Sequence, residues 1–493
     1  MQPQPNSVWN TAQLRAIDAF AIGESKISGF ELMHRAAAAA LSELRRRWPR
    51  AGRILVICGS GNNGGDGYVM ASLARAAGLD PRVGAVSDPD ALRGDAARAY
   101  AKWRDGGGET LPWAQAFERS ADVIVDALLG IGVSRELEGV YLAAVTRINS
   151  ASTPVLALDV PSGLHADTGH ILGGCVRADC TVTFIAQKLG LWLARGPDQA
   201  GEAVLADLDL RVWPDDLGAA GLLALDPASL AQALQPRERG ANKGRYGHVL
   251  VIGGGPGMPG AARLCGEAAL RSGAGLVSVA TAPEHAAQVA AMRPELMVSG
   301  VAAPDELMPI LARADVVAVG PGLGQSAWAR ALWSCAMASD KPLIVDADAL
   351  NLLAAQPESR EQWVLTPHPG EAGRLLGLST QEVQADRIGA VRALHARFGG
   401  TAVLKGAGSL IAGAAAPPHI CLHGNPGMAA PGMGDVLTGV IAGLQGQLRQ
   451  LGLAARLGVL AHALAGDQAA RSGQRGLMAG DVIAELRGCL NPS

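Results

Sequence analysis

The feature that most constrains this chain is a repeated unit, in which a short run rich in β-branched residues leads into a glycine-rich turn and then an apolar helix. In the first half, such runs lie at 54–58, 122–127 and 154–160, with weaker ones at 181–186 and 203–206. Buried strands that alternate with helices are typical of open parallel sheets. The unit therefore predicts an α/β fold, in which ligands bind where loops leave the carboxyl ends of the strands.

The same unit restarts after a junction at 211–235 that contains Pro214 and Pro227. Strand-like runs follow at 248–252, 315–319, 342–345, 363–365 and 401–404, and three Ala/Leu-rich helices close the chain. A chain of 493 residues is too long for one ordinary core. We therefore expect two domains, residues 1–225 and 226–493.

Two helices are expected before the first strand. Asn10 or Thr11 can cap one that runs to about residue 22, and Ser28 with Glu31 has the spacing of a capping box ahead of a second. After the first strand, the glycine-rich stretch 59–67 is expected to form a loop, with the next helix at 68–77. That loop matches neither the G-x-G-x-x-G dinucleotide motif nor a P-loop.

Charge and cysteine usage exclude several classes of function. Lys and Arg (42) nearly balance Asp and Glu (45), and no basic run is longer than Arg45 to Arg47, so neither nucleic acid nor a membrane surface is expected as a partner. The seven cysteines form no C-x-x-C pair and are interpreted as reduced buried thiols. With no signal-peptide pattern and no apolar run of about 18 residues, we expect a cytoplasmic protein.

Polar residues follow three strands of the first half at equivalent positions. They are Asn62, Asn63 and Asp66 after the first strand, Asp126 at the end of the second, and Asp159 with Ser162 at the end of the third. Each alone is more often a turn-former or a cap. Together they indicate a ligand site, and oxygen donors of low total charge suit an alkali cation or a polar ligand better than zinc.

The stretch PGMGDVLTG (431–439) places one carboxylate, Asp435, at the start of an apolar helix. Gly432 and Gly434 let the backbone approach a ligand closely, and free N–H groups at a helix start form an anion site. Asp435 is thus a candidate catalytic base. Alone the pattern is weak, because an Asp at a helix start is usually a cap.

Nine motifs carry a resemblance to a known family. NNGGDG, DALLGIG and LDVPSG resemble the NAD(P)HX epimerase domain; GGGPGMPGA, GPGLG, DADAL, TPHPGE, KGAGS and PGMGDVLTG resemble the ADP-dependent NAD(P)HX dehydratases of the ribokinase-like superfamily. In this order the chain resembles the bifunctional nicotinamide nucleotide repair family over nearly its full length. The resemblance implies an N-terminal Rossmann-like three-layer α/β/α domain and a C-terminal ribokinase-like α/β domain.

The resemblance also implies an activity. The first domain would interconvert R- and S-NAD(P)HX at C6 of the ring with K⁺ bound, and the second would dehydrate S-NAD(P)HX to NAD(P)H, with ADP as co-substrate, Mg²⁺, and release of AMP and phosphate. The partners would be NADHX, NADPHX and ADP, with no nucleic acid and no membrane, and the chain would form a homo-oligomer.

Residue roles in the first domain follow from the motifs. Asp159 would be catalytic and contact substrate, and Asn63, Asp126 and Ser162 would hold K⁺. The other substrate contacts would be Asn62, Asn63, Gly64, Gly65, Asp66, Gly130, Ile131, Gly132, Val133, Ser134, Arg135 and Glu136.

In the second domain Asp435 would be the base and contact substrate. The remaining substrate contacts would be Ala262, Gly322, Gly324 and His368, and the ADP site would be Lys405, Gly406, Ala407, Gly408, Ser409 and Gly434. Ala261 is an alternative to Ala262, and the contact within GPGLG is open by a residue or two. Without the resemblance, His368 could equally be a surface or packing histidine.

A different function is also conceivable. The second domain could be a kinase of small alcohols such as a hydroxymethylpyrimidine, joined to a non-catalytic N-terminal binding or scaffold domain. TPHPGE together with KGAGS favours the dehydratase, and the intact NNGGD, Asp126 and Asp159 favour the epimerase.

Overall fold

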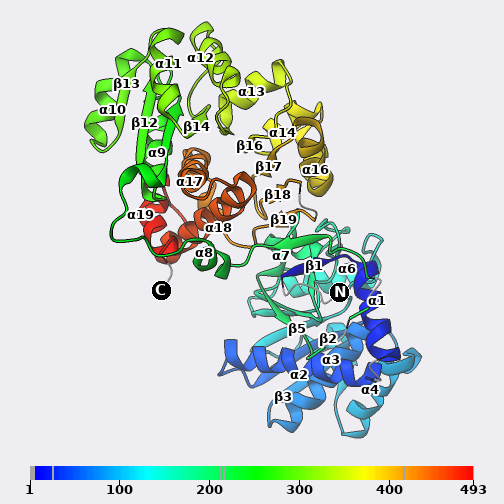
Figure 1. Cartoon of the computed structure of the whole chain (residues 1–493). Helices are drawn as coiled ribbons and strands as arrows, with labels where there is room; N and C mark the ends of the chain where they lie inside the picture. Colours follow the sequence, from blue (N-terminus) through cyan, green and yellow to red (C-terminus); the bar gives the residue numbers. More distant parts are fainter. Residues whose placement is uncertain (1–5, 25–26, 211–212, 215–216, 415–416, 492–493) are drawn as a thin grey trace. The chain divides into compact units, whose positions relative to one another are not determined.

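The computed structural model describes residues 6–24, 27–210, 213–214, 217–414 and 417–491. The chain divides into two compact units, unit 1 (Met1–Leu222) and unit 2 (Leu223–Ser493), coloured blue to green and green to red in Figure 1. Residues 211–212 and 215–216 of the expected junction lie outside the described ranges. Each unit is described by itself.

In its described part, unit 1 contains a seven-stranded sheet of order β4-β3-β2-β5-β6-β7-β9, with every pair parallel. The strands are β2 (Arg53–Cys58), β3 (Asp80–Ala85), β4 (Thr110–Pro112), β5 (Val123–Ala127), β6 (Val155–Leu158), β7 (Cys180–Phe184) and β9 (Glu202–Ala206). Strands β3 and β4 lie on one side of β2, and the strands from β5 onward lie on its other side. A crevice at the carboxyl ends of β2 and β5 therefore marks the expected ligand site.

Helices cover this sheet, and unit 1 also contains a short two-stranded ribbon that is not part of it. The helices are α1 (Thr11–Gly23), α2 (Gly29–Arg47), α3 (Asn62–Ala76), α4 (Gly94–Asp105), α5 (Trp113–Ala116), α6 (Gly139–Asn149) and α7 (Gly196–Ala200). β1 (Ser7–Trp9) pairs in parallel with β8 (Gln187–Lys188). The caps predicted for the first two helices are confirmed: Asn10 accepts from the N–H of Gln13, and Ser28 from that of Glu31. Glu31 bonds Arg35 rather than completing a capping box.

The prediction that 59–67 forms a loop before a helix at 68–77 is wrong, because α3 already begins at Asn62. Gly61 is extended and serves as the N-cap. The glycines are needed for packing: a Cβ on Gly64 would lie 2.2 Å from the carbonyl oxygen of Gly59, and one on Gly67 would lie 2.6 Å from the Cβ of Ala127. They bring the helix close to the sheet, and the free N–H groups of its first turn then face the end of β2.

Unit 2 has a mixed sheet of order β13-β12-β11-β14-β15-β16-β17-β18-β19-β10. The strands are β10 (Leu222–Ala224), β11 (His248–Ile252), β12 (Leu276–Thr281), β13 (Met297–Gly300), β14 (Val316–Val319), β15 (Leu343–Val345), β16 (Trp363–Leu365), β17 (Thr401–Leu404), β18 (Leu410–Ala412) and β19 (His419–Ile420). The strands from β13 to β17 are parallel, whereas β17, β18 and β19 pair antiparallel. The α/β fold expected from the repeated unit is thus confirmed in both units.

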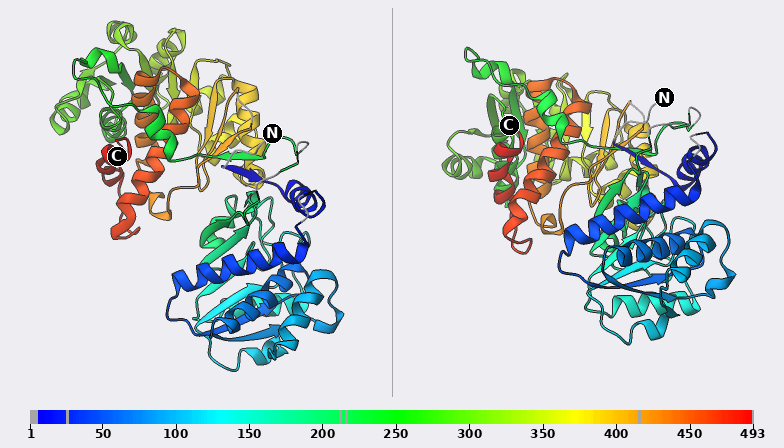
Figure 2. Two further views of the ribbon diagram at one scale, coloured as in Figure 1. Left: turned by 60° about the horizontal axis from the view of Figure 1, so that its bottom comes forward. Right: turned by 90° about the horizontal axis from the view of Figure 1, so that it is seen from below.

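The helices of unit 2 surround α17 (Met433–Leu448), which is buried along most of its length. They are α8 (Ala228–Ala233), α9 (Pro259–Arg271), α10 (Ala286–Met292), α11 (Pro304–Arg313), α12 (Ala327–Ala338), α13 (Ala347–Ala355), α14 (Pro369–Leu376), α15 (Thr380–Ala385), α16 (Arg387–Phe398), α17 (Met433–Leu448), α18 (Leu451–Ala469) and α19 (Ala479–Cys489). The orange helices α17 and α18 lie against the strands of this unit (Figure 2). A helix that is apolar along most of its faces needs such a position, and α17 carries Asp435 in its first turn.

None of the helices in the described ranges is both long and apolar enough to cross a membrane.

Candidate active sites in two units

Unit 1 contains a pocket of about 1320 Å³ at the carboxyl ends of β2, β5 and β6. Most of the residues predicted to contact substrate line it: Asn62, Asn63, Asp66, Gly130, Ile131, Gly132, Val133, Ser134, Arg135, Glu136 and Asp159. Gly64 and Gly65 are not among the lining residues, because both are buried within α3, where they pack against Gly59 and Met33. The sheet thus brings together segments that lie far apart in the sequence.

Asp126 and Ser162 form one buried polar cluster beside this pocket. The Oγ of Ser162 donates to Asp126 Oδ1 at 2.6 Å, and the Ser162 N–H donates to Oδ2 at 2.8 Å. The Leu128 N–H also donates to Oδ1, and that of Leu129 to the Ser162 Oγ. Burial raises the pKa of Asp126 to about 6, although the bonds from Ser162 and Leu128 oppose this shift.

Asn63 joins the cluster from the first turn of α3. Its Nδ2 donates to the Leu129 carbonyl at 3.0 Å, while its Oδ1 is buried without a partner in the described part of the chain. A buried amide oxygen is costly when unsatisfied. Together with the oxygens of Ser162 and Asp126 it forms a donor set that fits a monovalent cation.

Asp159 lies at the end of β6 in a backbone conformation that non-glycine residues rarely adopt, with φ 68°. Its Oδ1 is 2.5 Å from the Nζ of Lys188, a buried lysine from β8. Lys188 was not predicted as a site residue. Its only sequence signal is that it is the one charged residue between positions 181 and 193.

Two further carboxyl groups of the same pocket have raised pKa values. Burial, reinforced by the charge of Asp159, raises the pKa of Asp18 to about 6 and that of Asp66 well above the ordinary range. Asp66 was expected here, but Asp18 comes from α1, and nothing near it in the sequence indicates a site.

The candidate site of unit 2 is built around the first turn of α17. Gly432 is the N-cap in the left-handed conformation (φ 84°) and gives no side-chain cap, so the first N–H groups of the helix are available to an anion. Asp435 lies in this turn. Burial, followed by the nearby charge of Asp346, raises the pKa of Asp435 to about 7, although Lys405 opposes the shift.

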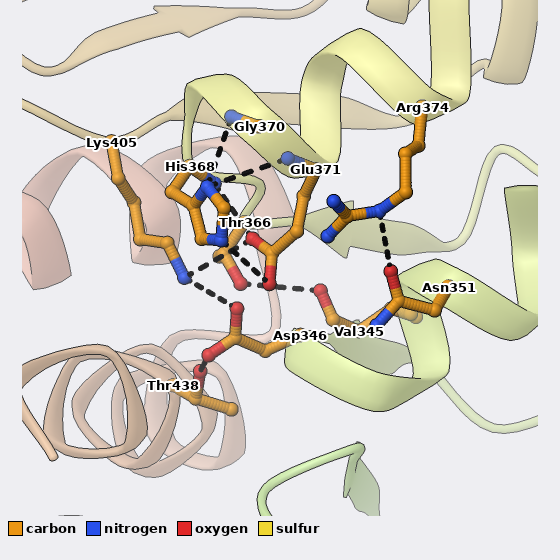
Figure 3. Close-up of polar contacts among 10 residues, drawn as sticks. All are labelled: Val345, Asp346, Asn351, Thr366, His368, Gly370, Glu371, Arg374, Lys405 and Thr438. Atoms are coloured by element: carbon orange, nitrogen blue, oxygen red, sulfur yellow. Dashed lines mark hydrogen bonds and ion pairs between the residues drawn. The ribbon is translucent and has the colours of Figure 1, made fainter. Parts of the chain in front are cut away.

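Asp346, which is buried, and Lys405, which is partly buried, form an ion pair beside Thr438 of α17 (Figure 3). The Lys405 Nζ lies 2.6 Å from Asp346 Oδ1, and the Thr438 hydroxyl donates to Oδ2 at 2.8 Å. Burial alone would raise the pKa of Asp346, but Lys405, Thr438 and Thr366 outweigh burial and lower it. Asp346 follows β15 in the DADAL motif, yet it was not predicted as a functional residue.

His368 and Glu371 begin α14 with a reciprocal cap. His368 Nδ1 accepts from the N–H groups of Gly370 and Glu371, and the Glu371 carboxylate accepts from the His368 N–H at 2.7 Å (Figure 3). The unprotonated Nδ1 assigns the ring proton to Nε2. Burial, then Lys405, lowers the pKa of His368, whereas burial raises that of Glu371 to about 7.

The glycine-rich loops of unit 2 approach these charges closely. A Cβ on Gly434 would lie 3.2 Å from the Lys405 Nζ. Gly406 and Gly408 follow β17 with positive φ, and Ser409 bonds back to Gly406. These glycines could not be replaced without moving Lys405 or straining the loop.

The remaining predicted contacts lie at the ends of β11 and β14. Gly322 and Gly324 have positive φ, and the Gly324 N–H donates to Asp348. A Cβ on Gly322 would lie 3.0 Å from the Cβ of Ala261, whereas Ala262 is fully buried in α9. No group of three or more His, Cys, Asp or Glu side chains in the described ranges forms a ready metal site.

Comparisons with known proteins agree with the two-unit organisation. Residues 29–190 match the family described as YjeF-related protein N-terminus, and residues 249–487 match NAD(P)H-hydrate dehydratase. The bifunctional NAD(P)H-hydrate repair enzyme Nnr of Coxiella burnetii is 47% identical over 98% of this chain and 99% of its own length. Its counterpart from Escherichia coli is 42% identical, over 99% of this chain and 95% of its own length.

Solved structures resemble unit 2. A ribokinase-like superfamily protein from Enterococcus faecalis aligns with a TM-score of 0.52 and 30% identity, covering 56% of this chain and 98% of its own. An ADP/ATP-dependent NAD(P)H-hydrate dehydratase from Bacillus subtilis, co-crystallised with ATP and Mg²⁺, aligns with a TM-score of 0.50 and 27% identity, covering 54% of this chain and 96% of its own.

These findings favour a repair enzyme over the alternative of a small-alcohol kinase fused to a non-catalytic domain. This chain belongs to the family of bifunctional NAD(P)H-hydrate repair enzymes, with an epimerase unit followed by a dehydratase unit.

Proposed function

We propose that unit 2 dehydrates S-NAD(P)HX in an ADP-dependent reaction and that unit 1 interconverts the R and S forms at C6. The observation that carries the proposal is Asp435: a half-buried carboxyl with a pKa near 7, in the first turn of a helix whose N–H groups are free, beside Lys405. A base and an anion site meet there, as transfer of a phosphoryl group to a hydroxyl requires.

In the proposed dehydration, Asp435 takes the proton of the C6 hydroxyl while the hydroxyl oxygen attacks the β-phosphorus of ADP. The bond to the bridging oxygen breaks, and AMP leaves. The C6–O bond then breaks, phosphate departs with the electron pair, and loss of the C5 proton restores the C5–C6 double bond. Lys405 and the amides of α17 stabilise charge on the phosphoryl oxygens.

We assign the nucleotide to Lys405, Gly406, Ala407, Gly408 and Ser409, which follow β17, and to Gly434 in the first turn of α17, beside the Lys405 ammonium. Mg²⁺ would screen the phosphate charges, and the carboxylates of Asp346 and Glu371 are the nearby hard oxygen donors. Because the described residues form no metal cluster of their own, Mg²⁺ would arrive with the nucleotide. His368 and the loop containing Gly322 and Gly324 would contact the dihydronicotinamide substrate, with Ala261 or Ala262 beside them.

In the proposed epimerisation, the C6–O bond breaks while the ring nitrogen lone pair stabilises C6, and the departing hydroxyl takes one proton to become water. Addition of water to the opposite face returns that proton. Asp159 is the proposed proton carrier. The unsatisfied Asn63 Oδ1, with Ser162 and Asp126, fits K⁺, which would supply fixed positive charge beside the substrate loops.

The test is a repair assay with purified full-length protein, given mixed R and S epimers, ADP, Mg²⁺ and K⁺. Dihydronicotinamide absorbance should return in two phases, one for each epimer, with one AMP and one phosphate released for each molecule repaired. Repair that needs no nucleotide would contradict the proposal. Assembly into a homo-oligomer, a cytoplasmic location and acceptance of both NADHX and NADPHX stay predictions.

A further inference from the structure

Lys188 is a buried lysine at the epimerase pocket to which no role has yet been given. It lies in β8 and is 2% exposed. Its Nζ donates to the carbonyl oxygen of Phe184 at 2.6 Å and lies 2.5 Å from Asp159 Oδ1. A lysine is almost never this buried unless it is paired, so the position of its ammonium is fixed by both contacts.

The two oxygens of Asp159 have different surroundings. Oδ1 accepts from the Lys188 ammonium and, at 3.3 Å, from the N–H of Phe184. Oδ2 points toward the substrate loops, because a Cβ on Gly130 would lie 3.7 Å from it and 3.5 Å from the Cβ of Asn63. No hydrogen bond to Oδ2 is found among the described residues. One oxygen is therefore anchored and the other is free.

The backbone holds the carboxylate in the same orientation. Asp159 has φ 68°, a conformation that costs energy for a non-glycine residue. Its N–H donates to the Val182 carbonyl at 2.8 Å, and the Val160 N–H donates to Leu158 at 2.9 Å. Backbone and ammonium thus fix both ends of the Asp159 side chain.

The other carboxyl groups that line this pocket are those of Asp18, Asp66, Asp95, Glu136 and Glu138, and Arg15 and Arg135 are its other cationic lining residues. Of these three cations Lys188 is the buried one, whereas both arginines are exposed. Its contact with Asp159 is therefore shielded from solvent, unlike an exposed pair whose geometry is loose and screened.

We propose that Lys188 is a positioning residue for epimerisation, which anchors Oδ1 of Asp159 and leaves Oδ2 as the oxygen that exchanges the proton with the C6 hydroxyl. This inference rests on the proposed role of Asp159. A group held in the reactive geometry by such contacts loses about 10²-fold in rate when it is misplaced by about 1 Å. Because the ammonium of Lys188 is engaged by Asp159 and Phe184, its loss should affect turnover more than binding.

The experiment uses the full-length protein with Lys188→Met, which keeps the length and removes the charge. The R-epimer phase of the repair assay should show kcat lowered by about 10²-fold with KM nearly unchanged. The S-epimer phase reports unit 2 and should be unaffected. Lys102→Met, the same change at an exposed lysine of α4, is the matched control and should leave both phases unchanged.

A second variant separates positioning from packing. Lys188→Ala leaves space for propylammonium, which should restore R-epimer turnover, whereas propanol of similar size and no charge should not. The same pair of additives decides the matter if Lys188→Met fails to fold. Equal rescue by both additives, or by neither, would overturn the proposal.

Asp159→Asn separates failure of this inference from failure of the proposed function. If Asp159→Asn loses epimerisation while Lys188→Met keeps its kcat, the positioning role is wrong and the proposed function stands. If Asp159→Asn epimerises normally, the role of Asp159 is wrong, and the inference falls with it. A raised KM at unchanged kcat in Lys188→Met would assign Lys188 to binding and overturn positioning.

Discussion

The two units each contain a lysine–aspartate pair, with one partner buried and the other partly buried, at the carboxyl end of a parallel strand. In unit 1 the Lys188 Nζ lies 2.5 Å from Asp159 after β6, and in unit 2 the Lys405 Nζ lies 2.6 Å from Asp346 after β15. The pairs differ in their relation to the proposed chemistry. Asp159 is the proposed proton carrier itself, whereas Asp346 only neighbours the proposed base, Asp435.

This difference has an electrostatic consequence. Asp346 is satisfied by Lys405 and Thr438, and its negative charge adds to the burial that raises the pKa of Asp435. In unit 1 the Lys188 ammonium contacts the proposed proton carrier, Asp159, directly. The carboxyl groups with raised pKa values are those of its neighbours Asp18 and Asp66. The same pair can therefore orient a reacting carboxylate or shift the pKa of one beside it.

The largest expected effect is that of Asp435→Asn on dehydration. This change keeps the side-chain size but removes the proton acceptor, so dehydration should fall by about 10² to 10⁴-fold, the usual contribution of a positioned base. The measurement is S-epimer turnover with ADP. R-to-S conversion in unit 1 should be unchanged, and ADP binding should change little.

If Asp435 were only a helix cap, Asn would replace it with little loss, since Asn caps about as well as Asp. Near-normal turnover in a folded Asp435→Asn protein would therefore show that Asp435 is not the base, and that the Asp346–Lys405 pair does not tune a reacting carboxyl.

Lys405→Met should have the next largest effect, on stability. It leaves the carboxylate of Asp346, 1% exposed, without its cation. Removing one partner of a buried pair costs about 3 to 5 kcal/mol, and urea unfolding of the full chain should show this loss in the transition of unit 2. Adding Asp346→Asn should recover part of it. Unchanged stability in Lys405→Met would show that the pair is not a structural anchor.

The pH dependence of dehydration should follow Asp435. The base acts as a carboxylate, and its pKa is raised to about 7. Turnover at low substrate should therefore rise as the pH increases through about 7 and then level off. Because Lys405 lowers this pKa, a folded Lys405→Met protein should need a higher pH for the same rise. A profile that is flat between about pH 5.5 and pH 8 would contradict this assignment.

The smallest expected effect concerns the cation of unit 1. Asn63→Ala removes the unpartnered Oδ1, so the K⁺ concentration for half-maximal epimerisation should increase by about 10-fold or more. The measurement is an R-epimer titration in a buffer whose base salt is choline chloride. S-epimer dehydration in the same protein is the control. If the K⁺ dependence of Asn63→Ala matches that of the unchanged protein, Asn63 is not a ligand.

Local sequence patterns predicted those parts of the fold that depend on local chemistry. The alternation of strands and helices and the caps at Asn10 and Ser28 were visible in neighbouring residues. The start of α3 could not be predicted from neighbouring residues, because glycines at 64 and 67 usually indicate a loop. Here close contacts with Gly59 and Ala127 require them within a helix. The antiparallel β18 and β19 were missed because their runs are only two or three residues long.

The candidate sites divide in the same way. The motifs predicted Asp159 and Asp435, but their partners come from distant segments. Lys188 reaches Asp159 through the ribbon β1–β8, Asp18 reaches the pocket from α1, and Asp346 meets Lys405 across 59 positions of the chain. Such pairs depend on the order of strands in the sheet, which no local pattern specifies.

The most direct test of the claim that each unit holds its own complete site is complementation between two inactive variants. Asp159→Asn should repair only the S form, and Asp435→Asn should repair neither. Mixed together with both epimers, ADP and K⁺, they should repair the full amount in two phases, because one protein supplies the S form that the other dehydrates. A mixture that stops after the S form, as Asp159→Asn does alone, would contradict the account.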